Sequence, residues 1–248
     1  MDQIVLITGG SRGIGAATAR LAAQRGYAVC ITYKNNRAAA DAVVDEIVHA
    51  GGKALALAGD VGEEADVLRI FQQLDAAFGR LTALVNNAGI LERQMRVDEM
   101  PLDRLQRVLS ANVVGSFLCA REAVKRMSTK HGGRGGAIVN LSSMAAKLGS
   151  PNEYVDYAAS KGAIDTFTIG LSKEVAAEGI RVNAVRPGVI YTDIHASGGE
   201  PNRVERIKGS VPMLRGGYAE EVARAILFLL SDEASYSTGT FIDVSGGR

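Results

Sequence analysis

The 248-residue chain contains no tryptophan, only two cysteines and three histidines, and almost no net charge. Lys and Arg number 28 against 27 Asp and Glu, so nothing favours binding to nucleic acid or to an anionic membrane. Cys30 and Cys119 have no Cys or His neighbours in the sequence that would suggest a metal site, and we expect none. So few cysteines are typical of a reducing compartment, and we therefore expect a cytoplasmic protein.

Long hydrophobic runs are also missing, since no apolar run approaches the roughly 18 residues that a membrane span needs. The chain enters a strand-like run at its start, and we expect no signal peptide. Hydrophobic residues make up 47% and charged residues 22%, which is typical of a globular protein with a sizeable core. Because no repeat, low-complexity tract or linker interrupts it, we expect residues 1–248 to form a single domain.

Short apolar runs alternate with helical patterns along the chain. The expected strands are Ile4–Ile7, Ala28–Thr32, Ala54–Ala58, Leu81–Val85, Ala137–Leu141, Ile180–Val185 and Thr240–Val244. The expected helices are Ala16–Arg25, Arg37–Ala50, Glu63–Phe78, Pro101 to about Lys130, Tyr157 to about Glu178, and Ala219–Leu230. This alternation predicts an α/β fold, a doubly wound parallel sheet with helices on both faces. Ligands of such sheets bind outside the carboxyl ends of the strands, so the loops there are the informative ones.

Tyr157 and Lys161 lie four residues apart in one helical pattern, so their side chains share a face. An unperturbed phenol titrates near pH 10, and a nearby ammonium lowers its pKa toward the range useful for general acid–base catalysis. The same spacing also occurs on solvated helix faces, so the pair alone does not define a site.

A glycine-rich loop, residues 8–15, separates the first strand from its helix. Gly9, Gly13 and Gly15 would let backbone amides approach a phosphate at the positive end of that helix. The spacing is neither the GxGxxG fingerprint nor a P-loop, and a glycine-rich turn without a ligand is the alternative.

Three later segments make the pattern specific. Asn86-Asn87-Ala88-Gly89 follows the fourth strand, Ser142-Ser143 the fifth, and Arg186-Pro187-Gly188 the sixth. With the glycine loop and the Tyr157-x-x-x-Lys161 pair, the chain resembles the short-chain dehydrogenase/reductase family from end to end. The resemblance implies a Rossmann-type fold with a seven-stranded parallel sheet and a nicotinamide dinucleotide cofactor.

The resemblance also implies catalytic roles. Tyr157 matches the acid/base, Lys161 the residue that lowers its pKa and holds the nicotinamide ribose, and Asn112 the residue that completes a proton relay through water. Ser143 matches the hydroxyl that binds the substrate oxygen, although Ser142 is adjacent and the register had to be chosen from the strand end Ile138–Leu141. Structural roles are the alternative: Asn112 satisfying buried backbone groups, Ser143 capping a turn and Asn86 closing a loop.

The cofactor is expected to be NADP. An acid near the end of the second strand commonly binds the ribose 2′-OH of NAD, whereas a basic residue accommodates a 2′-phosphate. No acid stands there, and Arg12 with Lys34 or Arg37 supplies basic charge, unless these are ordinary surface charges. The expected cofactor contacts are Gly9, Ser11, Arg12, Gly13, Ile14, Gly15, Tyr33, Lys34, Asp60, Val61, Asn87, Ala88, Gly89, Tyr157, Lys161, Pro187, Gly188, Ile190 and Thr192.

Residues 190–217 are expected to form the substrate lid, with His195 as a lid or surface residue rather than a catalytic or metal-binding one. Candidate substrate-pocket residues are Arg93, Met144, Leu148 and Tyr154, with ordinary packing as the alternative.

These observations favour an oxidoreductase that transfers a hydride between NADP(H) and a small carbonyl or alcohol substrate, whose identity the sequence leaves open. A dinucleotide-binding sensor or scaffold without turnover is the alternative, and a structural or protein-interaction module would leave the glycine loop unexplained. The family pairs its two long helices across subunits and also uses its C-terminal strand region, so the resemblance implies a homotetramer.

Overall fold

The computed structural model describes residues 3–248, in which seven strands form one sheet. The strands are β1 (Ile4–Ile7), β2 (Ala28–Tyr33), β3 (Lys53–Ala58), β4 (Ala83–Asn86), β5 (Gly136–Leu141), β6 (Ile180–Pro187) and β7 (Phe241–Val244). They run parallel in the order β3-β2-β1-β4-β5-β6-β7, which confirms the predicted doubly wound sheet. The strand order reverses between β1 and β4, and such a switch point opens a crevice at the carboxyl ends.

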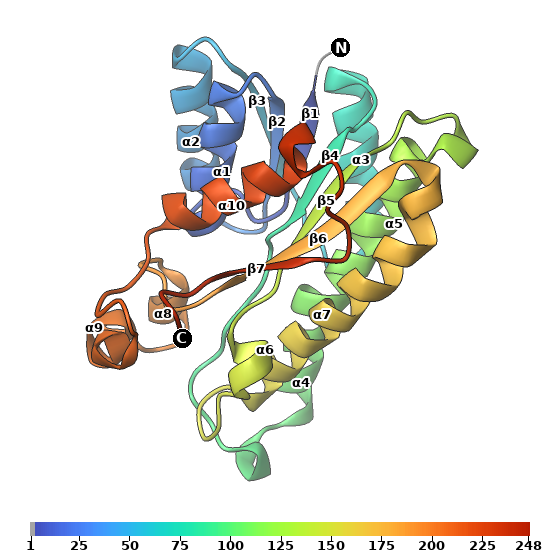
Figure 1. Ribbon diagram of the computed structural model, residues 1–248. Helices are drawn as coiled ribbons and strands as arrows, with labels where there is room; N and C mark the ends of the chain where they lie inside the picture. Colours follow the sequence, from blue (N-terminus) through green and yellow to red (C-terminus); the bar gives the residue numbers. More distant parts are fainter. Residues whose placement is uncertain (1–2) are drawn as a thin grey trace.

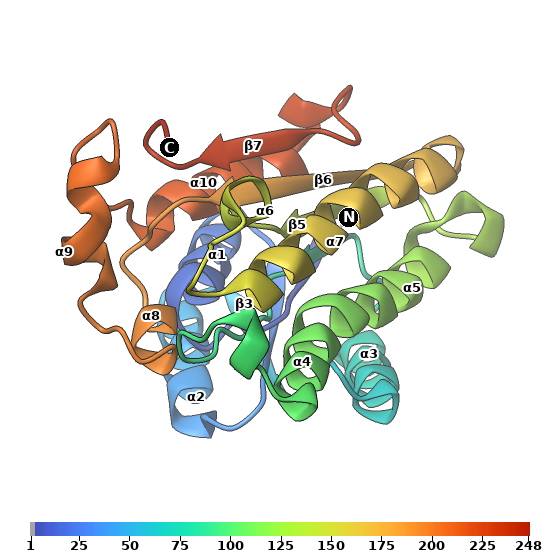
Figure 2. The same ribbon diagram turned by 90° about the horizontal axis from the view of Figure 1, so that it is seen from below.

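Helices cover both faces of this sheet. They are α1 (Gly13–Gln24), α2 (Arg37–His49), α3 (Glu64–Phe78), α4 (Leu102–Leu109), α5 (Gly115–Met127), α6 (Ala145–Leu148), α7 (Val155–Val175), α8 (Ile194–Ser197), α9 (Arg203–Ile207) and α10 (Ala219–Leu230). Figures 1 and 2 show α1, α2 and α10 on one face and α3, α5 and α7 on the other. The short helices α8 and α9 lie beyond the carboxyl ends of the strands (Figure 1).

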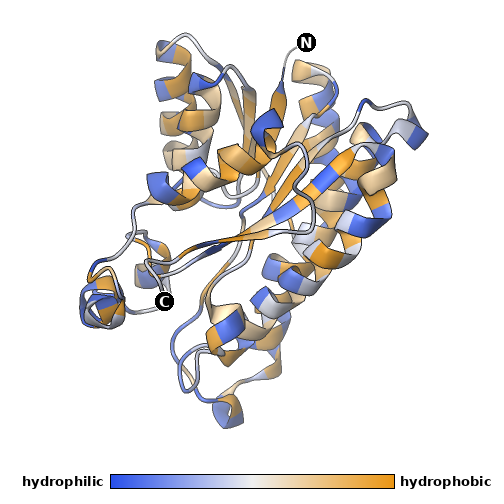
Figure 3. Cartoon of the chain, in the orientation of Figure 1, coloured by the Kyte–Doolittle hydropathy of each residue, from blue (hydrophilic) through white to orange (hydrophobic). Residues whose placement is uncertain are grey.

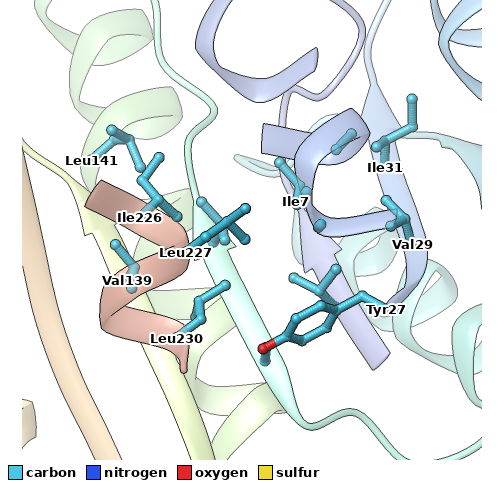
Figure 4. Packing of buried hydrophobic residues seen from close by; sticks show 14 of the residues in the cluster. Ile7, Tyr27, Val29, Ile31, Val139, Leu141, Ile226, Leu227 and Leu230 are labelled. Atoms are coloured by element: carbon cyan, nitrogen blue, oxygen red, sulfur yellow. The ribbon is translucent and has the colours of Figure 1, made fainter. Parts of the chain in front are cut away.

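The two largest hydrophobic clusters of residues 3–248 form two layers, one on each face of the sheet, and a third, small cluster contains Val189, Val204 and Val211. Along β1, Val5 and Ile7 pack into one layer, whereas Ile4 and Leu6 pack into the other. Figure 4 shows Ile226 and other residues of α10 packed over β5 in the first layer. The hydropathy colouring accordingly places apolar residues along the strands and on the sides of the helices that face them (Figure 3). Because both faces are covered, the central strands are continuous apolar runs in the sequence.

The long helix predicted from Pro101 to about Lys130 is wrong in detail. Pro101 precedes α4, and a π-helical segment, η2 (Ser110–Val114), joins α4 to α5. The helix then ends at Met127, and Lys130 lies in a separate 3₁₀ turn. A π turn holds one more residue than an α turn and carries no composition signal, and such bulges occur frequently at functional sites.

The other predicted strands and helices are present with small shifts of their ends, whereas α6, α8 and α9 were not predicted. No helix within residues 3–248 is both long and apolar enough to span a membrane.

Candidate active site

The glycine loop connects β1 to α1 at the carboxyl edge of the sheet. Gly9 and Gly13 have left-handed backbone angles, φ +64° and +54°, which glycine adopts without strain. At Gly15 a Cβ atom would lie 2.5 Å from the Gly9 carbonyl oxygen, so only glycine fits there. Arg12 precedes α1 without capping it, and the first turn of the helix carries no acidic side chain. The N-terminal amides of α1 are therefore available to an anion.

Hydrogen bonds fix the glycine loop to its neighbours. The Asn87 side-chain amide donates to the carbonyl oxygens of Thr8 at 2.8 Å and of Gly9 at 3.0 Å. The Thr8 hydroxyl accepts from the backbone amides of Asn87 at 3.0 Å and Ala88 at 2.9 Å. The Gly9 amide donates to the Thr32 hydroxyl at 3.0 Å, so hydrogen bonds tie the glycine loop to the end of β2 and to the loop after β4.

Tyr157 and Lys161 project from α7 toward the end of β5, where Ser143 lies. The Ser143 hydroxyl lies close enough to the Tyr157 phenol to lower the pKa of that phenol, and it accepts from the Ala145 amide at 3.1 Å. By contrast, the Ser142 hydroxyl donates to the Lys161 carbonyl oxygen at 3.2 Å and is buried. The geometry therefore brings Ser143, and not Ser142, to the phenol, in agreement with the predicted register.

The Lys161 ammonium lies 5.6 Å from the centre of the Tyr157 ring and donates to the Leu141 carbonyl oxygen at 2.6 Å. Burial lowers the pKa of Lys161 to about 8, against an opposing effect of the Asp165 charge. Burial also raises the pKa of Tyr157, while the Ser143 hydrogen bond and the Arg203 charge act to lower it. Burial of the phenol outweighs these two effects, and Lys161 is not among the groups that shift the pKa of Tyr157, so the lowering of that pKa by Lys161 stays a prediction.

Asn112 lies in the widened turn η2 and is almost completely buried. Its side-chain oxygen accepts from the Ile90 amide at 2.7 Å, and its nitrogen donates to the Ile90 carbonyl oxygen at 3.1 Å and the Ser160 hydroxyl at 3.0 Å. A Cβ atom on Gly89 would lie 3.2 Å from the Asn112 oxygen and 3.6 Å from the Lys161 nitrogen. Asn112 thus lies behind the cleft wall at Gly89 rather than in the cleft.

A continuous cleft of about 1150 Å³ extends from the glycine loop past Tyr157 to α8 and α9. Its lining includes Ser143, Tyr157 and Lys161 and every predicted cofactor contact except Gly15, which is packed beneath the loop. A cleft of this size accommodates a dinucleotide-sized ligand and a small substrate together.

At the β2 end of the cleft, the lining residues include Tyr33, Lys34 and Asp60, and Lys34 forms an ion pair with Asp60. Arg12 also lines the cleft, and its guanidinium donates to the Ser197 hydroxyl of α8 at 3.4 Å. Arg37 instead pairs with Asp41 on α2 and lies outside the lining. Of the two alternatives left by the sequence, Lys34 is the one at the cleft.

At the opposite end, Met144, Leu148 and Tyr154 line the cleft as predicted, but Arg93 does not. The lining also includes residues that the sequence analysis missed, among them Leu91, Glu153, Ile194, Arg203 and Ile207. The Arg203 guanidinium lies 4.7 Å from the centre of the Tyr154 ring. The two residues are about 50 positions apart in the sequence, so no local sequence pattern could predict this contact.

His195 belongs to α8, within residues 190–217, and is buried, so it is not a surface residue. Its Nε2 hydrogen-bonds the Ile190 carbonyl oxygen at 3.0 Å, which requires a proton on that nitrogen. Burial lowers the pKa of His195, which favours the neutral ring. Within residues 3–248 no group of three or more His, Cys, Asp or Glu side chains is arranged to hold a metal ion.

The strand order and the glycine loop at the head of α1 are those of Rossmann-type dinucleotide-binding proteins. Residues 9–248 match the family model described as enoyl-(acyl carrier protein) reductase. Together with the relatives described next, this match shows that the chain belongs to the short-chain dehydrogenase/reductase family and is an oxidoreductase.

The chain is 62% identical over 245 residues to an Escherichia coli (strain K12) protein described as uncharacterized oxidoreductase YgfF, covering 99% of each chain. It is 40% identical over 246 residues to a 3-oxoacyl-[acyl-carrier-protein] reductase of Synechocystis, covering 99% of this chain and 96% of the relative. Among solved structures, a short-chain dehydrogenase/reductase from Serratia marcescens matches with a TM-score of 0.91 at 32% identity. That match covers 99% of this chain and 97% of the other.

Proposed function

We propose that this oxidoreductase uses NADP(H) to interconvert a small carbonyl compound and its alcohol. The observation that carries the proposal is the convergence of the Tyr157 phenol, the Ser143 hydroxyl and the Lys161 ammonium on one cleft that begins at the glycine loop. Relatives 40% and 41% identical to this chain are named 3-oxoacyl-[acyl-carrier-protein] reductases, which is consistent with a carbonyl substrate.

The residues at the glycine loop fit a dinucleotide. A Cβ atom at Gly15 would collide with the loop itself, and the uncapped start of α1 offers amides to a pyrophosphate. Arg12 and Lys34 would hold a 2′-phosphate, because no carboxylate follows β2 to accept a ribose hydroxyl. When bound, the reduced nicotinamide supplies a hydride to the carbonyl carbon.

Tyr157 and Ser143 would then act on the carbonyl oxygen. Both can donate hydrogen bonds to it, and these bonds strengthen as the oxygen gains negative charge during reduction. The raised pKa of Tyr157 keeps the phenol protonated at neutral pH, so it can deliver the proton that the developing alkoxide needs. Lys161 would hold the nicotinamide ribose. Asn112 would support the wall of the site at Ile90 from behind, and the proton relay through water that we propose for it rests on the resemblance alone.

We further propose that the chain forms one domain, in which residues 190–217 act as the substrate lid, and that it works in the cytoplasm on small-molecule substrates. The lid assignment is supported by α8 and α9, whose residues Ile194, Arg203 and Ile207 line the substrate end of the cleft. A sensor or scaffold without turnover is less favoured, because dinucleotide binding alone does not require the Tyr157–Ser143 pair.

The proposal is tested by titrating the protein with NADPH and NADH and by following NADPH consumption with a carbonyl panel that includes acetoacetyl-CoA and 2,3-butanedione. NADPH should bind more tightly, and Arg12→Ala/Lys34→Ala should weaken NADPH about tenfold or more while changing NADH little. Arg37→Ala is the matched control and should leave both affinities near those of the parent. Equal affinity for the two cofactors would refute the NADP assignment, and no consumption with any carbonyl would refute the reductase.

A further inference from the structure

Residues 90–95, here called the strap, lead from β4 toward α4, and the first two of them, Ile90 and Leu91, form part of one wall of the cleft. Leu91 of the strap lines the cleft. The lid packs against the other side of this residue, since a Cβ atom on Gly198 would lie 3.0 Å from a Leu91 methyl group. The position of the strap therefore sets the width of the substrate end.

The strap is held from three sides. Asn112 binds both backbone groups of Ile90, as described above. The Met95 amide donates to the Glu153 carbonyl oxygen at 3.0 Å, in the loop before α7. Between these points, Arg104 of α4 donates from Nη1 to the Arg93 carbonyl oxygen at 2.6 Å.

Arg104 also binds the helix that carries Tyr157. Its Nε and Nη2 donate to the two carboxylate oxygens of Asp156 at 2.7 and 3.2 Å. Both side chains are only 3% exposed, and Asp156 lies in the first turn of α7. Because Asp156 immediately precedes Tyr157, one buried guanidinium joins the substrate wall to the residue next to the phenol.

Stability alone does not account for this arrangement. A buried ion pair loses the hydration of both charges, and well-packed apolar residues of similar size often give equal or greater stability. A fork that binds a carboxylate with one edge and a carbonyl with its remaining nitrogen instead fixes the angle and separation of the two segments.

We propose that the Arg104–Asp156 pair is a positioning device that sets where the Tyr157 phenol lies relative to the strap. A substrate packed against Leu91 is thereby held at a fixed distance from the proton donor. The proposal rests on the proposed function of Tyr157, and neither Arg104 nor Asp156 lines the cleft, so they act through the strap and α7.

The test replaces the pair by apolar residues, Arg104→Met/Asp156→Leu, which avoids leaving an unpaired buried charge. This variant should melt near the parent temperature and bind NADPH within about twofold of the parent. Its kcat for acetoacetyl-CoA or 2,3-butanedione should fall about 10- to 100-fold, the effect expected of a misplacement near 1 Å. Arg104→Lys, which keeps the ion pair but not the fork, should recover part of that loss.

Hydrogen exchange of the NADPH-bound protein gives a readout that does not depend on turnover. Peptides covering residues 90–96 and 153–159 should exchange faster in the double variant than in the parent. The matched control is Arg126→Met/Asp75→Leu, which removes another forked ion pair, between α5 and α3, and should change neither kcat nor exchange in these peptides.

Parental kcat together with parental exchange in the double variant would overturn the proposal. So would a parallel loss of melting temperature, NADPH affinity and kcat, because that result describes a merely structural pair. If Tyr157→Phe kept parental turnover, the proposed function would fail instead, and faster exchange of both peptides would still support the link between the strap and α7.

Discussion

At the scale of single residues, the Tyr157 hydroxyl is the group on which the proposed chemistry depends. Tyr157→Phe removes the proton donor and keeps the ring, so turnover should fall about 10²- to 10⁴-fold or more while the NADPH dissociation constant changes little. Ser143→Ala should also lower turnover, because that hydroxyl lies beside the phenol in the cleft and would bind the substrate oxygen with it. Ser142→Ala is the matched control and should cost much less, since Ser142 binds only the Lys161 backbone. Steady-state rates at saturating NADPH separate these outcomes, and near-normal turnover of Tyr157→Phe would contradict the mechanism.

Lys161 gives a prediction about stability. Its pKa falls from 10.5 in its ordinary state to about 8 in the folded protein, so burying the ammonium at pH 7 costs on the order of 3 kcal/mol. Between pH 8 and 10.5 the unfolded chain binds more protons at this site than the folded chain, so stability increases with pH there.

Lys161→Met removes that cost and should melt at a higher temperature than the parent at pH 7, while weakening NADPH binding. The difference in melting temperature should narrow by pH 9.5, where the parent lysine is already neutral in the folded state. Thermal melts of both ligand-free proteins at the two pH values measure it. A variant less stable than the parent at pH 7 would show that the hydrogen bond to Leu141 outweighs the desolvation cost.

For Tyr157 and Lys161 the sequence could predict the placement of the side chains but not their pKa values. The four-residue spacing of Tyr157 and Lys161 correctly placed both side chains toward one site, because helix geometry is local. The raised pKa of the phenol could not be predicted from this spacing, because it depends on burial and on Ser143 and Arg203, which reach Tyr157 only through the tertiary fold.

At the scale of elements, the glycine loop shows how close packing constrains a sequence. In Gly15→Ala the new Cβ would meet the Gly9 carbonyl oxygen and the Asn87 side chain at 2.5 and 2.6 Å. Relieving such contacts typically costs about 1–3 kcal/mol, and the shifted loop should bind NADPH more weakly. In Gly170→Ala, within α7, the added atom meets nothing within 4 Å, so NADPH affinity should be unchanged. Thermal melts and NADPH titrations of both variants test this, and an unaffected Gly15→Ala would contradict the packing argument.

Elements with a strong local period were predicted with nearly correct ends, among them α10 and the central strands. The π-helical turn at Asn112 was not, because it depends on the two-sided hydrogen bonding of Asn112 to Ile90, 22 residues earlier. For Asn86 the sequence suggested only a local role, in closing the loop after the fourth strand. Asn86 is buried between strands, where it donates to Asn140 at 2.9 Å, and Asn140 donates in turn to Thr168 of α7 at 2.9 Å.

At the scale of the whole molecule, α4, η2, α5 and α7 present an apolar surface that the chain does not cover. Leu109, Val114, Phe117 and Ile169 are all more than 40% exposed, and Phe117 stacks on Phe167 of α7 with ring centres 3.8 Å apart. Exposed apolar side chains gathered on one face are typical of a protein–protein contact. α4, η2 and α5 correspond to the helix predicted from Pro101 to about Lys130, and α7 corresponds to the helix predicted from Tyr157 to about Glu178. These two predicted helices are the ones that the family pairs across subunits.

We therefore predict a homotetramer with two-fold axes, in which the α5–α7 surface of each subunit packs on its own copy in a partner. Light scattering of the parent at micromolar concentration should give four times the chain mass of 26.1 kDa. Phe117→Asp/Ile169→Asp places like charges on this surface and should halve that mass, since contacts through the β7 region would remain.

The matched control is Val48→Asp, which adds a charge at an equally exposed apolar residue of α2, on the opposite face of the sheet. That variant should keep the parental mass, because α2 is not expected to contact a partner. Two carboxylates on this surface repel the same two carboxylates on the two-fold copy, so the double variant should lose mass, most strongly at low salt. A parent that scattered as a monomer would refute the tetramer, and a double variant with the parental mass would exclude the α5–α7 surface as the contact.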